Sequence, residues 1–361
     1  MATIGILIAI VITILILRKV YAKSTVKNLD VTLSISANEA TEGDVLTLTE
    51  VLTNNKWLPI PWVTVKFRAA KELLFAQNAA VSDAYYRNEL FHILMQQKIT
   101  RRLKFTCSKR GYYSVDGVEL TAWDILMEQR YVQRFSCDIR LTVYPGLIPT
   151  EEIDELCTQV YGQLHSKLPI NPDPFSFRGI REYAPGNPLK AVNFKASARG
   201  AGLLVNIWEY TNARQIVVLL DTKRYIQLYN EEMEERAVKI AAAIAEKMQG
   251  IPIAFLTNGK SIINSDEVIN VPHGIGQNHT RSILESLACI DFTNQDISHL
   301  SETLAKITHT DSSEYWLISP YYSKEIEEAI LRLKDVGAKT AWIMPGPRPS
   351  TADYLNQVIV V

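Results

Sequence analysis

The hydrophobic residues of this chain change their spacing partway along its length, and this change constrains the fold more than any other feature. From residue 30 to residue 144 they alternate with polar residues, as at Val31, Leu33 and Ile35. After residue 215 they form nearly continuous apolar runs separated by stretches with helical spacing. Alternation is typical of strands with one buried face, and continuous runs are typical of strands buried on both faces. The sequence therefore predicts an all-β domain followed by an α/β domain.

The first part of the chain predicts a β-sandwich over residues 29–146. Short alternating segments are punctuated by Pro and Gly residues, which favours an immunoglobulin-like arrangement. The spacing is less regular over residues 73–94, where a loop or inserted turn is expected at 76–86. Six cations in this part could indicate nucleic-acid binding. They are Lys98, Arg101, Arg102, Lys104, Lys109 and Arg110. Because they alternate with apolar residues and lack interleaved stacking aromatics, they indicate the solvent face of a strand and no nucleic-acid partner.

The second part predicts strands that alternate with helices. We expect strands over 215–220, 251–256, 315–318, 338–344 and 357–361, and helices over 231–248, 279–290 and 324–336. Such alternation implies parallel pairing and a doubly wound sheet. Ligands of these sheets bind beyond the carboxyl ends of the strands, which here means near Asp221, Thr257 and Ser319.

The N-terminus predicts a transmembrane helix over residues 1–23. Residues 2–17 are almost entirely apolar, and the stretch continues after a pair of cations. A cleaved signal peptide fits less well because no Lys or Arg precedes the run, and a buried core helix is a further alternative. The nearby cations all follow the run, at Arg18, Lys19, Lys23 and Lys27. This asymmetry predicts a single-pass protein of the cell membrane with its globular part in the cytoplasm.

Four segments are therefore expected along the chain. They are a transmembrane helix (1–23), a β-sandwich domain (29–146), a connector helix and linker (147–175), and a segment with the α/β domain (176–361). The formal net charge of −1 gives no overall attraction to nucleic acid or acidic lipid. The four cysteines form no C-x-x-C pair, so neither a disulfide framework nor a zinc site is predicted.

A basic segment precedes the α/β pattern and is dense in residues that fix backbone shape. Pro185 and Gly186 form a turn pair, Asn187 suits a helix N-cap, and a helix is expected from Pro188. The charged residues that we expect to contact a partner are Arg178, Arg181, Glu182, Lys195 and Arg199. The alternative is that these charges pair within the chain and only stabilise the fold.

This segment resembles the signature of the bacterial domain of unknown function 58 family, Phe-Arg-x-x-Arg-x-Tyr-x-Pro-Gly-Asp followed by a helix ending in Trp-Lys-x-Ser-Ala-Arg. The chain departs from it at Asn187 for Asp, Lys190 for Arg and Phe194 for Trp. Members are found beside MoxR-type AAA+ ATPases. The resemblance implies a von Willebrand factor A-like C-terminal domain and a MoxR-type ATPase as partner.

The residues after the first α/β strand predict a degenerate metal site. A working A domain has Asp-x-Ser-x-Ser there, which supplies a carboxylate and two hydroxyl oxygens to a hard cation. This chain has Asp221, then Lys223 and Tyr225 at the two Ser positions. We therefore expect no bound metal and no cofactor. His273 and His279, which flank Gly274 and Gly276, are interpreted as surface residues of a loop.

These observations together predict a membrane-anchored cytoplasmic binding or scaffold protein. It would partner a MoxR-type AAA+ ATPase in protein maturation or assembly, without catalysis of its own, because no phosphate loop, H-E-x-x-H or Gly-x-Ser-x-Gly motif is present. The alternative is a hydrolase that uses the strand-end crevice near Asp221 as its active site.

Overall fold

The computed structural model describes most of the chain and divides it into two compact units. The described residues are 2–24, 27–75, 86–124, 127, 129–165, 177–183, 192–198, 202–208, 215–224, 230–263, 268–292, 300–305, 313–346 and 358–360. Unit 1 comprises Met1–Leu147 with Ser261–Ser265 and Leu284–Ile290. Unit 2 comprises Ile148–Lys260, Asp266–Ile283 and Asp291–Val361.

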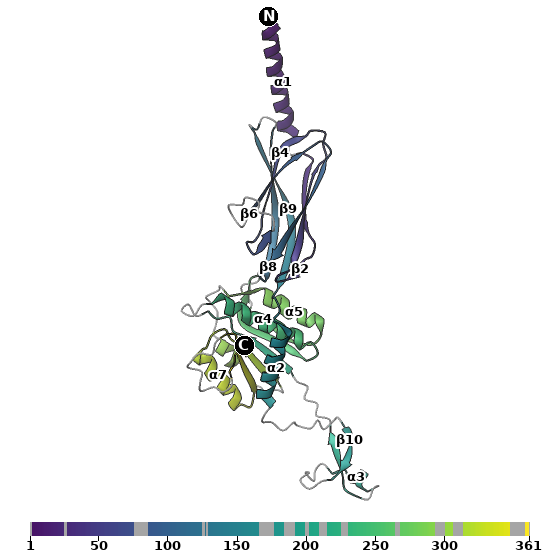
Figure 1. Cartoon of the computed structure of the whole chain (residues 1–361), viewed down its shortest axis with the longest axis vertical. Helices are drawn as coiled ribbons and strands as arrows, with labels where there is room; N and C mark the ends of the chain where they lie inside the picture. The colour runs from purple at the N-terminus through teal and green to yellow at the C-terminus, as the bar shows by residue number, and fades with distance from the viewer. Residues whose placement is uncertain are drawn as a thin grey trace. The chain divides into compact units, whose positions relative to one another are not determined.

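Unit 1 begins with the apolar helix α1 (Ala2–Ser24), drawn in purple in Figure 1. Its window Ile4–Tyr21 has a mean hydropathy of 2.3 and is almost wholly exposed. Within the described part of the chain, it is the one helix long and apolar enough to cross a membrane. By length and composition, α1 suits a membrane span or an N-terminal signal sequence.

The rest of unit 1 is built from two β-sheets. One has the order β1-β3-β7-β5 and the other β2-β9-β8-β4-β6. Neighbouring strands are antiparallel except β2 and β9, which run parallel. The strands are β1 (Leu29–Ile35), β2 (Glu39–Thr41), β3 (Val45–Asn54), β4 (Ile60–Arg68), β5 (Leu73–Phe75), β6 (Tyr86–Ile93), β7 (Lys98–Cys107), β8 (Gly111–Trp123) and β9 (Arg130–Tyr144).

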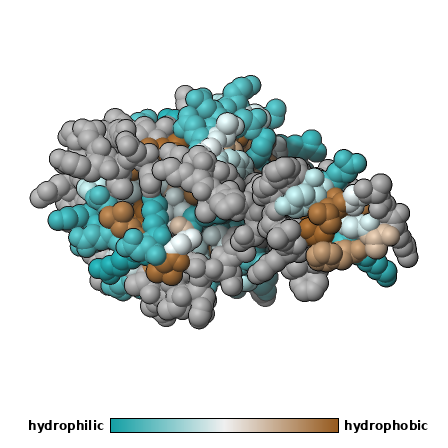
Figure 2. All heavy atoms as spheres, turned by 90° about the horizontal axis from the view of Figure 1, so that it is seen from below, coloured by the Kyte–Doolittle hydropathy of each residue, from teal (hydrophilic) through white to brown (hydrophobic). Residues whose placement is uncertain are grey.

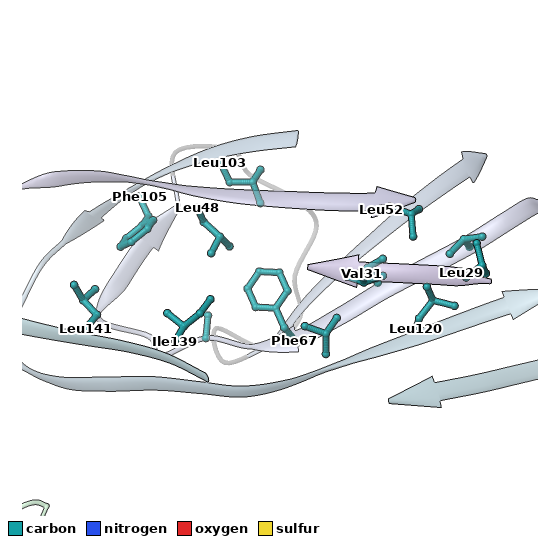
Figure 3. Close-up of a cluster of buried hydrophobic side chains, with 14 of the residues drawn as sticks. Leu29, Val31, Leu48, Leu52, Phe67, Leu103, Phe105, Leu120, Ile139 and Leu141 are labelled. Atoms are coloured by element: carbon teal, nitrogen blue, oxygen red, sulfur yellow. The ribbon is translucent and has the colours of Figure 1, made fainter. Parts of the chain in front are cut away.

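The two sheets face each other across a hydrophobic core. Figure 3 shows Phe67 of one sheet lying between the sheets, opposite Leu48 and Leu103 of the other. In β7 the alternate residues Leu103, Phe105 and Cys107 enter this core, as the sequence pattern predicts. In β7 the cations Arg102 and Lys104 are exposed, as expected, whereas Arg110 after this strand is buried.

Strands β5 and β6 of unit 1 were not predicted. β5 and β6 lie in a stretch whose irregular pattern indicated no strand, and β6 pairs with β4 along most of its length. The loop expected at 76–86 lies outside the described residues apart from Tyr86, which begins β6.

Unit 2 contains a mixed seven-stranded sheet with the order β14-β13-β12-β16-β17-β18, and β15 pairs with β13. The pairs from β13 to β18 are parallel, as predicted, and the edge pair β13–β14 is antiparallel, which was not predicted. The strands are β12 (Gln215–Leu220), β13 (Ile253–Ser261), β14 (Val268–Gly274), β15 (Ile290–Asp291), β16 (Ser313–Ile318), β17 (Lys339–Met344) and β18 (Val358–Val360).

Helices cover both faces of this sheet. Tyr315 and Leu317 of β16 pack with apolar residues of α6 and α7, whereas Trp316 points the other way and meets Tyr161 of α2 edge to face. α4 packs beside α2 and contacts β12 and β16. The helices are α2 (Thr150–His165), α4 (Glu231–Lys247), α5 (Gln277–Ala288), α6 (Leu300–Ala305) and α7 (Lys324–Asp335). Burial on both sides explains why the strands are continuously apolar.

Candidate functional site

The basic segment contributes to a small two-stranded ribbon. β10 (Phe177–Glu182) pairs antiparallel with β11 (Leu204–Trp208), and Arg181 lies opposite Val205. Val192 forms an isolated bridge with Val205, and both valines are buried. The sequence predicted a helix through this position, and that prediction is wrong at Val192 because its backbone pairs with β11.

A single helical turn follows and is held against β11 by hydrogen bonds. In α3 (Phe194–Ser197), the Asn193 side chain accepts a hydrogen bond from Ala196 N at 2.9 Å, which caps the turn. The Ser197 hydroxyl oxygen accepts from Leu204 N at 2.8 Å, and Asn193 N donates to Leu204 O at 2.8 Å. Asn193 and Ser197 therefore fix the backbone of this turn through their side chains.

Two of the residues between Asn193 and Ser197 are exposed. Phe194 is 72% exposed, and Lys195 beside it is exposed as well. Leu203, which precedes β11, is 49% exposed, and Glu182 at the end of β10 also faces solvent. Figure 2 shows hydrophobic atoms, in brown, reaching the surface among hydrophilic ones. The ribbon thus presents apolar and charged side chains together.

The structure places the other predicted partner-binding residues only in part. Arg178 and Arg181 lie on β10, and Arg178 lies where the register of β10 and β11 shifts. Arg199, and the turn residues Pro185, Gly186 and Asn187, lie outside the described residues.

A second candidate site lies at the carboxyl ends of β12 and β16 and beside the middle of β13, where the sequence placed Asp221, Ser319 and Thr257. The Asp221 carboxylate accepts hydrogen bonds from Asn258 Nδ2 (2.9 Å), Lys223 N (3.1 Å) and Ser319 Oγ (3.2 Å). Asp221, Asn258 and Ser319 are each at most 1% exposed. Their polar atoms therefore bind one another inside unit 2.

Further hydrogen bonds extend this network towards β13. Asn258 Oδ1 accepts from both the backbone N (2.9 Å) and the hydroxyl (3.0 Å) of Thr222. The Thr257 hydroxyl donates to Leu220 O at 2.8 Å. Gly259 lies so close to Thr222 that a Cβ added to the glycine would be 2.9 Å from the Thr222 hydroxyl oxygen. Packing of this density leaves the end of β12 filled by the chain itself.

Sequence reasoning missed a buried ion pair beside this network. The guanidinium of Arg224 donates to both carboxylate oxygens of Glu234, at 2.6–3.0 Å, and the Glu234 side chain is only 2% exposed. The Tyr321 hydroxyl donates to the same carboxylate at 3.3 Å, and burial raises the pKa of Tyr321. The only sequence signal is an acidic residue in the first turn of α4, which is common in helices.

Of the three residues of the predicted degenerate metal site, the structure describes Asp221 and Lys223. Lys223 follows Asp221 at the first hydroxyl position, and Tyr225 lies outside the described residues. Among the residues that the structure describes, no group of three or more His, Cys, Asp or Glu side chains could hold a metal ion.

The two histidines occupy regular elements and not the loop that was expected. His273 belongs to β14 and His279 to α5. The Nε2 atom of His279 lies 2.7 Å from Ile253 O, which attaches α5 to β13. Burial, with a smaller contribution from His279, lowers the pKa of His273. The contact of His279 is structural.

Comparison with known proteins identifies no relative. No protein-family model matches the sequence, and no curated protein matches it. The similar solved structures include a cohesin module from the Clostridium perfringens ATCC13124 family 33 glycoside hydrolase, with 8% identity, 32% of this chain and 97% of the module covered, and a TM-score of 0.24. A second is the C-terminal domain of Wzt, with 9% identity, 33% of this chain and 75% of that chain covered, and a TM-score of 0.24. A third is the bacterial hydrophobin BslA, with 14% identity, 31% of this chain and 93% of that chain covered, and a TM-score of 0.21. At these scores, the likenesses establish neither a family nor a function for this chain.

Proposed function

We propose that this chain is a membrane-anchored binding or scaffold protein that partners a MoxR-type AAA+ ATPase in protein maturation or assembly. In this proposal α1 is a membrane span and the globular part lies in the cytoplasm. Unit 1 is an immunoglobulin-like sandwich, and unit 2 is a von Willebrand factor A-like domain. The resemblance of the basic segment to the domain of unknown function 58 signature supports this assignment.

One observation carries the proposal, namely the exposure of Phe194 and Lys195 on a turn whose backbone is fixed. Asn193 and Ser197 hold that turn through hydrogen bonds to Ala196 and Leu204. Interfaces often contain an aromatic side chain that the partner removes from water. A cation beside it is then met by acidic groups at the edge of the partner's surface. The complementary surface has an apolar pocket with an acidic rim.

The alternative function, a hydrolase with Asp221 as general base, is less well supported. A general base must reach the proton that it removes, directly or through one water molecule. Asp221 is 1% exposed, and both of its oxygens accept hydrogen bonds from the chain. The strand end thus has the filled character expected of a supporting scaffold.

The proposal is tested by measuring the affinity of the detergent-solubilised full chain for the MoxR-type ATPase of the same organism. We expect Arg181→Glu combined with Lys195→Glu to weaken binding at least about tenfold, because like charges then meet across the interface and each 1.4 kcal/mol is a factor of ten. Phe194→Ala should weaken binding by a similar factor, and added salt should weaken the wild type.

The control is Lys324→Glu, which makes the charge change of Lys195→Glu alone at an exposed position of α7. It should bind as the wild type does. Unchanged affinity of the Arg181→Glu, Lys195→Glu variant, with folding retained, would contradict the docking role of the ribbon.

Sidedness requires a thiol probe at an exposed site. Cys107, Cys157 and Cys289 are buried, and burial raises the pKa of each thiol, so they react slowly with maleimides. Asp335→Cys places a thiol at an exposed position of α7. We expect a membrane-impermeant maleimide to label it only after permeabilisation, and labelling of intact cells would place unit 2 outside the cytoplasm.

A further inference from the structure

Three connections of the sandwich and the chain leaving α1 come together at one end of unit 1. Asn54, the last residue of β3, pairs with Leu29, the first residue of β1. Ile60 at the start of β4 pairs with Ile93 at the end of β6, and Trp62 pairs with Trp123 at the end of β8. The β3–β4, β6–β7 and β8–β9 connections therefore all lie where the chain enters from α1.

Hydrogen bonds join two of these connections to each other and to the chain that leaves α1. The Asn54 amide nitrogen donates to Leu58 O (3.0 Å) and to Leu94 O (2.8 Å), which links the β3–β4 and β6–β7 connections. Gln96 N donates to Lys56 O at 2.9 Å, and Asn55 N donates to Asn28 O at 3.0 Å. The positions of side chains on the β3–β4 and β6–β7 connections are thereby fixed relative to one another.

Large apolar side chains on these connections are exposed. We call them the Trp57 face, which consists of Trp57 (72% exposed), Leu94 (56%), Met95 (60%) and Met127 (55%). Turn residues are ordinarily small or polar, so four large apolar side chains on three turns need a partner that removes them from water.

The C-terminal end of α1 lies at the same place. The Tyr21 hydroxyl donates to Pro59 O at 3.1 Å, and Lys56 Nζ donates to Lys27 O at 2.9 Å. The seven residues 22–28 span at most about 25 Å when fully extended. A bilayer crossed by α1 is therefore within reach of the Trp57 face, whatever direction the helix takes.

The chemistry around the face suits phospholipid headgroups. A cavity of about 340 Å³ is lined by Val20 of α1, by Lys27, and by residues of two of the connections, including Trp57 and Gln96. Arg18 and Lys19, in the last turns of α1, and Lys27 are exposed. Tryptophan is enriched at the membrane interface, and cations beside a span attract anionic lipid.

We infer that the Trp57 face inserts into the headgroup region of the bilayer that α1 crosses, and that it binds phospholipid. This inference rests on the proposed assignment of α1 as a membrane span. In this arrangement the sandwich contacts the membrane directly. A domain that was only tethered by α1 would leave these side chains in water. A second copy of the chain is the competing occupant.

The test uses the full chain in vesicles of phosphatidylcholine with phosphatidylglycerol. The photoreactive residue p-benzoylphenylalanine is placed at Trp57, Met95 or Met127, and after irradiation the attachment of labelled lipid is measured. Val45 and Leu74 are matched controls, because both are exposed apolar residues and both lie beside Thr106 at the opposite end of the sandwich. That end is about 30 Å away along β3.

We expect lipid attachment at the three test positions to exceed that at the controls at least fivefold. Equal yields at both ends, or cross-linked protein dimers in place of lipid adducts, would overturn the inference. Extraction with alkaline carbonate separates the two ways of failing. Release of the protein would show that α1 is not a span and would contradict both proposals. Protein that stays in the membrane but carries no lipid adduct would contradict only this one.

Discussion

Replacing Asp221 by alanine should destabilise unit 2, and replacing it by asparagine should do so far less. Alanine removes the acceptor of Asn258 Nδ2 and of Lys223 N, whereas Ser319 keeps its 2.6 Å hydrogen bond to Tyr321 O. Each buried donor left without an acceptor costs about 1–3 kcal/mol. Because Lys223 N is only partly buried, we expect Asp221→Ala to lose about 3–4 kcal/mol.

Asparagine keeps an oxygen for the same two donors. Its amide group then faces Ser319 Oγ, which can accept through a lone pair when its single hydrogen turns from position 221 to Tyr321 O. Only the extra strength of hydrogen bonds to a charged acceptor is lost, so Asp221→Asn should cost about 1 kcal/mol. Asp335→Ala, at an exposed position, should change stability by no more than about 0.5 kcal/mol.

The assay must report unit 2 alone, since a chain with two units need not unfold in one step. Hydrogen exchange of peptides that cover β12, β13 and β16 of the full chain in detergent, measured at increasing urea, meets this need. Equal stability of Asp221→Ala and Asp335→Ala would refute the hydrogen-bond network. Partner binding retained in Asp221→Asn would support docking, whereas a catalytic base would not tolerate that change.

Three further predictions concern buried charges. Arg224→Met should destabilise unit 2 by about 3–5 kcal/mol, because Glu234 is left charged and buried, and adding Glu234→Leu should restore at least half of this loss in the same exchange assay. Burial lowers the pKa of Lys56 from 10.5 to about 8. Between these pH values the unfolded chain therefore binds more protons than the folded chain. The stability of the wild type relative to Lys56→Met should rise with pH across that window, by at most about 3 kcal/mol. Millimolar Mg²⁺ should leave the urea midpoint of unit 2 unchanged, because the Asp221 oxygens already accept hydrogen bonds; a midpoint that rises with Mg²⁺ and stops doing so in Asp221→Ala would contradict this.

The sequence closely predicts the bounds of three elements of unit 2, one continuously buried strand and two helices with regular apolar spacing. β12 has the predicted bounds, and α4 and α7 each end within one residue of the prediction. β13 was expected to end at Leu256, because Thr257, Asn258 and Gly259 are typical turn residues. Instead it continues to Ser261, since the side chains of Thr257 and Asn258 bind the end of β12 and the edge strand β14 pairs with its last residues.

The ribbon could not be predicted in the same way. Its strands β10 and β11 are separated by residues 183–203, and neither has a long alternating pattern. The conformation at Val192 depends on its pairing with Val205, which no local propensity reports. Exposure of Phe194 likewise follows from the hydrogen bonds of Asn193 and Ser197 with their neighbours and not from hydrophobicity, which by itself predicts a buried side chain.

Order of the ribbon and binding of a partner are thermodynamically linked. A two-stranded ribbon is at best marginally stable by itself, and here the buried contact that joins the turn to it is the pair Val192 and Val205. A ligand that binds only the folded ribbon stabilises it by mass action. Any variant that loosens the ribbon, such as Ser197→Ala, therefore weakens binding without touching the partner. Lys195 lies on the exposed side of α3, apart from the hydrogen bonds of Ser197, and its reversal of charge separates contact from folding.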